Sequence, residues 1–179
     1  VAVAMEGRRP LLSEVQALVT HSSSERPRRT TSGVDSSRVA MILAVLQQHA
    51  EIRLHNHDVF VSSVGGARLT EPSNDLAIAL AIASAWRGQA LGRNVAAIGE
   101  LGLSGELRRV RDVGLRLAEA GRMGFRAAMV PALTAEDAGH SRVLDGMRVV
   151  DVDNIARALA LLGMNADGAW DGNPRRQLP

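Results

Sequence analysis

Apolar residues recur at helical spacing in four stretches of the chain, and each stretch predicts a helix. The predicted helices cover residues 36–51, 76–86, 111–123 and 154–162. We expect Asp35 or Ser36 to cap the first and Asp153 to cap the last. The second is apolar on nearly every face, which marks it as the buried central helix. Gly124 and Gly163 follow the third and fourth helices and predict where they stop.

Alternation of apolar and polar residues predicts strands between these helices. Four single strands are expected over residues 58–64, 95–98, 126–130 and 147–152. Residues 4–19 predict a strand pair around a turn at Gly7, with a helix as the alternative for the second half. Residues 21–37 are rich in Ser, Thr, Arg and Pro without periodicity, so we expect a loop there. Strands that alternate with helices indicate an α/β domain.

The composition fits one folded domain. The chain has 179 residues, of which 46% are hydrophobic, enough to bury a core. We place the domain at residues 1–163. Residues 164–179 lack periodicity and are expected to form a disordered tail. A chain that opens on Val1 also suggests a fragment of a longer protein.

No stretch of the sequence has the features of a membrane span or a signal peptide. The longest apolar stretch, residues 76–86, is too short to cross a bilayer. The first residues lack the order of charged, apolar and small segments that a signal peptide has. The absence of cysteine excludes disulfides and thiolate metal sites, and fits the cytoplasm of a bacterium.

All 21 cationic residues are arginines, and the sequence contains no lysine. A P-loop needs its lysine to reach the nucleotide phosphates, and a Ser-Lys pair needs a lysine as its base. The sequence therefore excludes both kinds of catalytic site. With 19 acidic residues the formal net charge is only +2, so binding of nucleic acid depends on whether the arginines cluster.

Two long stretches of the sequence carry recognisable motifs. Residues 64–88 read VGGARLTEPSNDLAIALAIASAWRG, and residues 98–131 read IGELGLSGELRRVRDVGLRLAEAGRMGFRAAMVP. Pro27-Arg28-Arg29 and Asp58-Val59-Phe60-Val61 precede them. In this order the motifs span residues 4–162. They resemble the proteolytic domain of Lon-type peptidases and, more closely, the C-terminal domain of the RadA family of bacterial DNA-repair proteins.

The resemblance implies a Lon-protease-like fold of the ribosomal protein S5 domain 2 type, in which a mixed sheet packs with helices. In active Lon-type peptidases a serine stands at the start of the central helix, and a lysine lies in the helix after the glycine-rich block. These positions fall on Ser73 and Gly114, with Arg111 and Arg116 as the nearest cations. Arginine stays protonated near neutral pH and cannot act as the base. The resemblance therefore implies that the peptidase pair is broken and that this chain is no enzyme.

Ser73 has two interpretations. It is either a nucleophile at a helix N-terminus or an N-cap whose hydroxyl satisfies the free backbone N–H groups. We favour the cap, because no lysine or neighbouring histidine is present to activate the hydroxyl. A distant histidine among the five in the chain remains open.

Two further motifs invite a functional interpretation. His55 and His57 alternate before a strand, but two histidines without further ligands do not make a metal site, so we expect exposed polar residues and no metal. The glycine-rich block over residues 99–106 lacks Rossmann or P-loop spacing. We interpret it as tight turns with close backbone approach.

Two arginine clusters are the candidate DNA-binding residues. Arg28 and Arg29 stand in the predicted loop, and Arg108, Arg109 and Arg111 follow the glycine-rich block. Phosphate contact and solvated surface charge are equally compatible with such clusters. Aromatic residues make up only 2% of the chain, which argues against base stacking and favours contact with the backbone of duplex or branched DNA.

The resemblance also implies partners and cofactors outside this chain. Members of the family use ATP to drive branch migration of recombination intermediates, through an N-terminal zinc-binding segment and a RecA-like ATPase core. A parent protein is thus expected to bind ATP, Mg and Zn, to act beside a RecA-type recombinase at the nucleoid, and to form a homo-hexamer. This chain would need no cofactor and would be a DNA-binding and oligomerisation scaffold. The alternatives are a Lon-like serine peptidase with an unusual base and a ring-assembly module that binds no DNA.

Overall fold

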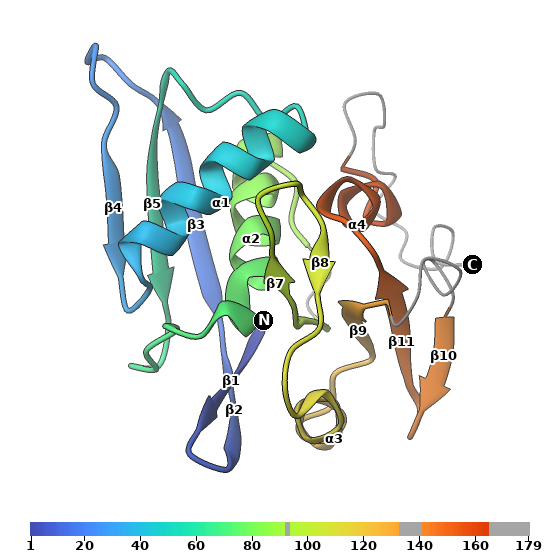
Figure 1. Ribbon diagram of the computed structural model, residues 1–179. Helices are drawn as coiled ribbons and strands as arrows, with labels where there is room; N and C mark the ends of the chain where they lie inside the picture. Colours follow the sequence, from blue (N-terminus) through green and yellow to red (C-terminus); the bar gives the residue numbers. More distant parts are fainter. Residues whose placement is uncertain (92–93, 133–140, 165–179) are drawn as a thin grey trace.

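The computed structural model describes residues 1–91, 94–132 and 141–164 (Figure 1). Its elements follow the order β1 (Ala2–Glu6), β2 (Arg9–Ser13), β3 (Val15–His21), β4 (Arg29–Ser32), α1 (Ser36–His49), β5 (His57–Ser63), η1 (Pro72–Asn74), α2 (Asp75–Arg87), β6 (Val95–Ala97), β7 (Glu100–Leu101), β8 (Leu107–Arg108), α3 (Val113–Arg122), β9 (Ala127–Pro131), β10 (Ser141–Leu144), β11 (Met147–Val152) and α4 (Ile155–Leu161).

Two sheets and a small hairpin form the frame of the fold. The larger sheet has the order β10-β11-β9-β6-β1-β2, with parallel central strands and an antiparallel strand at each edge. The smaller sheet has the order β3-β5-β4, where β3 runs antiparallel and β4 parallel to β5. Strands β7 and β8 pair as a separate hairpin. This arrangement confirms the prediction of an α/β fold with mixed sheets packed against helices.

Helix α2 is the centre of the molecule. Every residue from Asp75 to Ala83 is buried, which confirms the prediction of a buried central helix. The helix packs against β3 on one side and against α1, α4 and β6 on others (Figure 1). Alternate positions of its sequence are alanines, and their small side chains allow neighbouring elements to approach closely.

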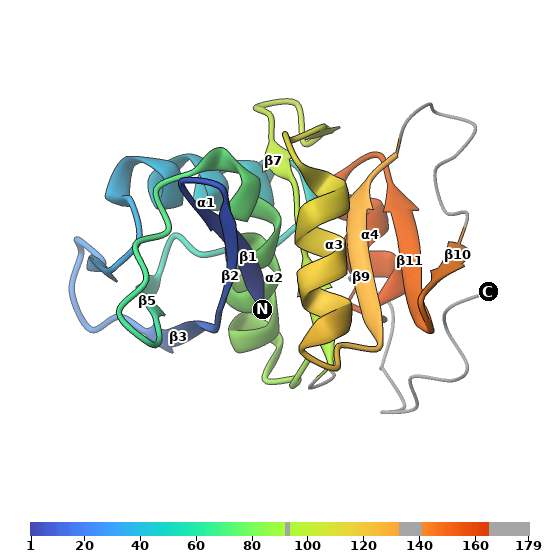
Figure 2. The same cartoon turned by 90° about the horizontal axis from the view of Figure 1, so that it is seen from below.

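Helix α3 covers the opposite face of the larger sheet (Figure 2). Its buried residues Leu117 and Ala120 pack against Val3 and Val130 in a second, smaller core. The helix ends as predicted at Gly124, which has a φ of 84°. The amide of the next residue, Phe125, donates to the carbonyl of Ala120 at 3.0 Å, as in a glycine-terminated helix.

The capping predictions are confirmed at α1 and wrong at α4. An Asp35 carboxylate oxygen accepts from the Arg38 amide at 2.8 Å, as an N-cap does. At α4 the cap is Asn154, whose side chain accepts from the Arg157 amide at 2.8 Å, and not Asp153. The Asp153 carbonyl instead accepts from the Leu107 amide, so this residue belongs to the segment before the helix.

The predicted strands are confirmed to within one or two residues. Residues 4–19 fall in β1, β2 and β3, so the helical alternative for the second half is wrong. The prediction that 21–37 is entirely loop is also wrong, because β4 lies within it. This strand has only four residues and forms through pairing with β5, so no local periodicity marks it.

The side chain of Arg29, the first residue of β4, has a structural role. Its guanidinium donates to the carbonyl oxygens of Arg28 at 3.0 Å, of Leu54 at 2.8 Å, and of His57. These bonds tie β4 to the segment that joins α1 to β5. Arg28 beside it is exposed and uses its backbone amide, bonded to an Asp58 carboxylate oxygen at 2.7 Å.

The C-terminal boundary differs by one residue from the prediction. Met164 is 1% exposed and belongs to the main core, although the tail was expected to begin there. Residues 165–179 lie outside the described residues. Among the helices that the structure describes, none has the length and apolar character needed to cross a bilayer.

The contacts of Arg29 predict a stability difference between two neighbouring arginines. We expect Arg29→Ala to lower the free energy of unfolding by about 1–2 kcal/mol, because three carbonyl oxygens lose a charged donor. Arg28→Ala removes the same charge from an exposed side chain and should change stability by less than about 0.5 kcal/mol. Thermal denaturation of both variants measures this. Equal losses would mean that charge, and not these bonds, sets the effect.

Candidate serine–arginine site and arginine surface

The N-terminal end of α2 joins several elements through its backbone. Glu71 is extended, and Pro72 then opens the short helix η1, which continues into α2. The amide of Gly99 donates to the carbonyl of Ser73 at 2.8 Å, and the amide of Leu76 donates to the carbonyl of Gly99 at 3.1 Å. The start of the glycine-rich block is thereby fixed against the start of the central helix.

Ser73 is buried and hydrogen-bonded through its side chain. Its hydroxyl donates to a Glu71 carboxylate oxygen at 3.0 Å and accepts from the Arg116 guanidinium at 3.0 Å. Neither η1 nor α2 has a side-chain hydrogen bond at its cap. The prediction that Ser73 is an N-cap is therefore wrong, because both sides of its hydroxyl are engaged by charged neighbours.

Arg116 is the cation beside the serine. It is 3% exposed, pairs with the Glu71 carboxylate at 2.9 Å, and also donates to the carbonyls of Val3 and Arg111. The residue assigned to the lysine position from sequence, Gly114, is exposed, and a Cβ built there would meet nothing within 4 Å. The structure thus brings Arg116, two residues further along α3, to the serine.

The charges around Ser73 favour a structural role for this residue over a catalytic one. Burial alone would raise the pKa of Glu71, but hydrogen bonds from Arg116 and Ser73 outweigh it and lower that pKa. Glu71 is therefore a weak base, and arginine stays protonated. None of the four histidines that the structure describes is hydrogen-bonded to Ser73, and His140 lies outside the described residues.

Asp75 is a second buried charge at the same end of α2. Its side chain is 0% exposed and pairs with the Arg38 guanidinium of α1 through both carboxylate oxygens, at 3.1 Å in one contact. It also accepts from the amide of Leu101 at 3.1 Å. Burial raises the pKa of Asp75, while the bonds from Arg38 and Leu101 oppose this shift.

The glycine-rich block forms the β7–β8 hairpin, as the prediction of tight turns requires. A Cβ built at Gly102 would lie 2.0 Å from a Glu106 side-chain oxygen, so a larger residue there would displace the Glu106 carboxylate from its present position. The Glu106 carboxylate accepts from the Ser104 amide at 3.1 Å and from the Arg108 guanidinium at 2.9 Å. These bonds fix the conformation of the hairpin. They also engage Arg108, one of the candidate DNA-binding arginines, in an ion pair within the domain.

The candidate DNA-binding arginines fall into two groups in space. Arg28 and Arg29 lie at the start of β4, far along the chain from the segment that leads from β8 into α3. In that segment Arg108 pairs with Glu106, whereas Arg109 and Arg111 are exposed and have no ion pair within the described ranges.

Sequence analysis missed a further pair of arginines. Arg8 and Arg9 form part of the turn between β1 and β2, are exposed, and make no ion pair with any residue that the structure describes. Of the two strands that this turn joins, β1 contacts η1 and β2 contacts α3. The Gly7-Arg8-Arg9 turn was the available signal, but the sequence does not show which other segment it meets.

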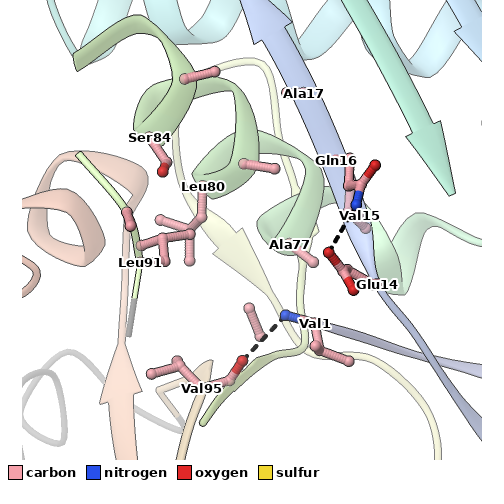
Figure 3. Close-up of a pocket in the computed structure, with 14 residues that line it drawn as sticks. Val1, Glu14, Val15, Gln16, Ala17, Ala77, Leu80, Ser84, Leu91 and Val95 are labelled. Carbon is pink, nitrogen blue, oxygen red and sulfur yellow. Dashed lines mark hydrogen bonds between the residues drawn. The ribbon is translucent and has the colours of Figure 1, made fainter. Parts of the chain in front are cut away.

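Neither the described histidines nor the cavity beside α2 forms part of the site around Ser73. His57 lies opposite His21 with ring centroids 5.6 Å apart, while His55 is exposed. Among the described residues, no group of three or more His, Asp or Glu could hold a metal ion. A cavity of about 700 Å³ lies along α2 and the start of β3 and is lined mainly by small apolar side chains (Figure 3). Ser73 is not among its lining residues.

The fold and the site together define a class of protein. The parts of a Lon-type domain are a serine just before a buried helix, a glycine-rich hairpin, and a following helix that supplies a cation to the serine. Here Ser73 in η1 precedes α2, and the cation is an arginine in place of the lysine base. A family model described as subunit ChlI of Mg-chelatase matches residues 30–134.

Individual relatives agree on one kind of protein. The chain is 48% identical over 159 residues to the DNA repair protein RadA of Mycolicibacterium smegmatis, which covers 89% of this chain and 33% of that protein. The RadA proteins of Mycobacterium tuberculosis and Escherichia coli are 43% and 42% identical over 93% and 90% of the chain, each covering 34% of the relative.

The chain therefore belongs to the family that this model describes, and it is similar to the RadA proteins. It spans about a third of the length of these relatives.

The lowered pKa of Glu71 predicts how its ion pair responds to acid. The folded state keeps Glu71 ionised to lower pH than the unfolded chain does, so its contribution exists above the ordinary pKa of 4.5 and is lost as the pH falls through the lowered value. We expect Glu71→Gln to be about 1–2 kcal/mol less stable than wild type at pH 7, a figure reduced for the partly exposed carboxylate.

Urea unfolding between pH 7 and pH 3 checks this prediction. The difference between the two proteins should shrink as the pH falls below about 4.5 and through the lowered pKa of Glu71, because only below that lowered value do both folded proteins carry a neutral side chain at position 71. Glu119→Gln is a matched control, since Glu119 pairs with the exposed Arg122. A difference that persists unchanged at pH 3 would show that the ion pair is not its cause.

Proposed function

We propose that this chain is a non-proteolytic DNA-binding and oligomerisation scaffold of a RadA-type DNA-repair protein. The observation that carries the proposal is the environment of Ser73. Its hydroxyl lies between a carboxylate of lowered pKa and a permanently charged guanidinium, and neither group can remove its proton near neutral pH. In place of a Lon-type catalytic pair, this site holds a partly buried ion pair of Glu71 and Arg116 that joins β1, η1 and α3.

DNA contact is proposed for the arginines that have no partner in the described structure. Several arginines already form ion pairs with carboxylates, as Arg108 does with Glu106. The turn with Arg8 and Arg9 and the segment with Arg109 and Arg111 lie at the same end of the molecule (Figure 2). Exposed guanidinium groups in neighbouring segments suit the phosphates of duplex or branched DNA without reading sequence.

The remainder of such a protein would supply the chemistry. Since the relatives are about three times as long as this chain, we propose that a parent carries the ATPase core, with ATP and Mg, and a zinc-binding segment. It would act with a RecA-type recombinase at the bacterial nucleoid, as a homo-hexamer. A ring would present several copies of the arginine surface to one duplex and thereby increase avidity.

Two alternative functions are a Lon-like peptidase and a ring-assembly module that binds no DNA. A Lon-like peptidase would need a base that approaches Ser73 from outside the described residues. A ring-assembly module without DNA binding is favoured by the exposed apolar side chains Leu103 and Leu115, which are 71% and 53% exposed.

The Ser73 environment predicts that the chain does not hydrolyse peptides. Incubation of the full chain with casein and with fluorogenic peptides should show no turnover, because no base can activate the hydroxyl. Ser73→Ala serves as the reference and should be indistinguishable from wild type. Turnover by wild type that disappears in Ser73→Ala would establish the peptidase alternative.

The arginine surface predicts binding to duplex DNA that weakens steeply with salt. Replacing Arg9, Arg109 and Arg111 by alanine should reduce affinity at least roughly tenfold for any sequence and lower the salt slope by about two to three, since each lost phosphate contact removes about 0.9. Fluorescence anisotropy with labelled duplex over a salt series measures both quantities.

Arg157→Ala is the control, because it removes an exposed charge on α4, away from this surface. It should leave the salt slope nearly unchanged. Equal slopes for wild type and the triple variant would remove these arginines from the DNA site. A chain that sediments as an oligomer and binds no duplex at low salt would leave the ring-assembly module.

A further inference from the structure

The first three strands form a ladder that leaves one side of β3 without a neighbour. Strands β2 and β3 are separated by the single residue Glu14 and follow each other along one direction. On one side β2 pairs antiparallel with β1, from the turn back to Ala2 opposite Ser13. On the other side β3 pairs with β5 and is the edge strand of its sheet. The free edge of β3 therefore begins where the β1 ladder reaches its end.

The backbone bonds that are present show which groups lie on this free edge. The Glu14 carbonyl accepts from the Val64 amide at 2.9 Å, on the β5 side. Because the N–H and C=O groups of successive residues point to opposite sides of a strand, the even-numbered residues of β3 face β5. The residues whose N–H and C=O groups face the other side, where no described residue bonds to them, are Val15, Ala17 and Val19.

The cavity of about 700 Å³ lies along this free edge (Figure 3). It is lined by Val15 and Ala17 of β3, by Leu80 among the residues of α2, and by Val95 at the start of β6. Val1, the residue before β1, also lines it. The cavity thus occupies the space beside β3 in which a further strand would lie.

The bonds of Val1 give the direction of such a strand. The Val1 amino group donates to the Val95 carbonyl at 3.1 Å, and the Val1 carbonyl accepts from the Ala97 amide at 2.9 Å. Both groups face β6, so a residue attached before Val1 would turn its own groups to the opposite side, towards Val15. Burial lowers the pKa of the Val1 amino group, whereas a neutral peptide N–H at this position would bury no charge.

We propose that the segment which precedes this domain in a longer parent protein continues β1 backwards and adds as a strand to the free edge of β3. The proposal rests on the proposed function only in requiring such a parent. The first residue before Val1 pairs with Val15, and the third pairs with Ala17. Their side chains lie on the α2 side, where Val15 and Ala17 pack against the main core, and fill the cavity. The added strand joins the two sheets.

The geometry favours this segment over a strand from another molecule. Strand β1 already runs antiparallel to β2 and in register, so a continuation of β1 needs no loop to reach β3. A strand from a second molecule would lose translational and rotational freedom on binding. It would also have to end at Val1, which lines the cavity. The remainder of the parent is therefore joined to this domain through a strand and not through a free linker.

The test compares this chain with a chain that begins about ten residues earlier in the parent, the length of a long strand. Amide hydrogen exchange of both chains is followed residue by residue by NMR. In this chain the amides of Ala17 and Val19 should exchange rapidly, because nothing bonds to them. In the longer chain their exchange should slow by at least about 100-fold, since the added ladder must open first.

Two proline variants of the longer chain form a matched pair. Ala17→Pro removes an amide on the free edge without removing a bond to β5, a change that edge strands tolerate, and should return Val19 to rapid exchange. Thr31→Pro makes the same change on β4, the opposite edge of the sheet. There the Arg28 carbonyl accepts from the Val59 amide, so alternation turns Thr31 outward. Thr31→Pro should keep Val19 protected, and circular dichroism confirms that both variants are folded.

Equally rapid exchange of Ala17 and Val19 in the two chains would overturn the proposal. Protection in the shorter chain that grows with protein concentration would show that a second copy covers the edge, and would also overturn it. Exchange is measured without DNA, whereas the variant of Arg9, Arg109 and Arg111 tests duplex binding. Failure of either experiment therefore leaves the other readable.

Discussion

The rest of the structure depends on one constraint, which is that the buried start of α2 must hold a carboxylate. Asp75 has no exposed surface, so its charge has to be matched inside the protein. Arg38 of α1 and the amide of Leu101 provide the match. One side chain thus sets the position of a helix and of the glycine-rich hairpin relative to α2. Two residues earlier, Ser73 joins Glu71 and Arg116 and sets the position of α3. The Glu71 to Asp75 segment is therefore a junction: Glu71 and Ser73 hold α3 through Arg116, and Asp75 holds α1 and the hairpin.

The main elements could be predicted because their signals are local. The one-face spacing of α1, the continuous apolar run of α2 and the glycine after α3 each depend on neighbours a few residues away. The elements that were missed depend on distant partners. Strand β4 exists because β5 offers it a parallel edge, and β10 because it pairs with β11. The cap of α4 was misplaced by one residue, since Asp153 and Asn154 are both good capping residues and only tertiary contacts distinguish them.

The candidate site was only partly predictable for the same reason. The sequence identified Ser73 and showed that no lysine is present. It did not show that Arg116 is the cation beside the serine, because that contact depends on which side of α3 the arginine side chain points to. Similarly, Arg28 and Arg29 looked alike in sequence. In the fold both are exposed, but only the Arg29 guanidinium is bonded to three carbonyl oxygens. Neighbouring arginines therefore separate into structural and available groups only when the acceptors around them are known.

The exclusive use of arginine has a consequence for regulation. A lysine-based surface can lose its charge through acetylation, or through titration at high pH. The exposed guanidinium groups of Arg8, Arg9, Arg109 and Arg111 can do neither, and the same holds for the buried one of Arg116. The positive charge of these side chains is thus constant at the pH of a living cell. Ionic strength and the number of copies brought together remain as the variables through which its electrostatic attraction can be adjusted.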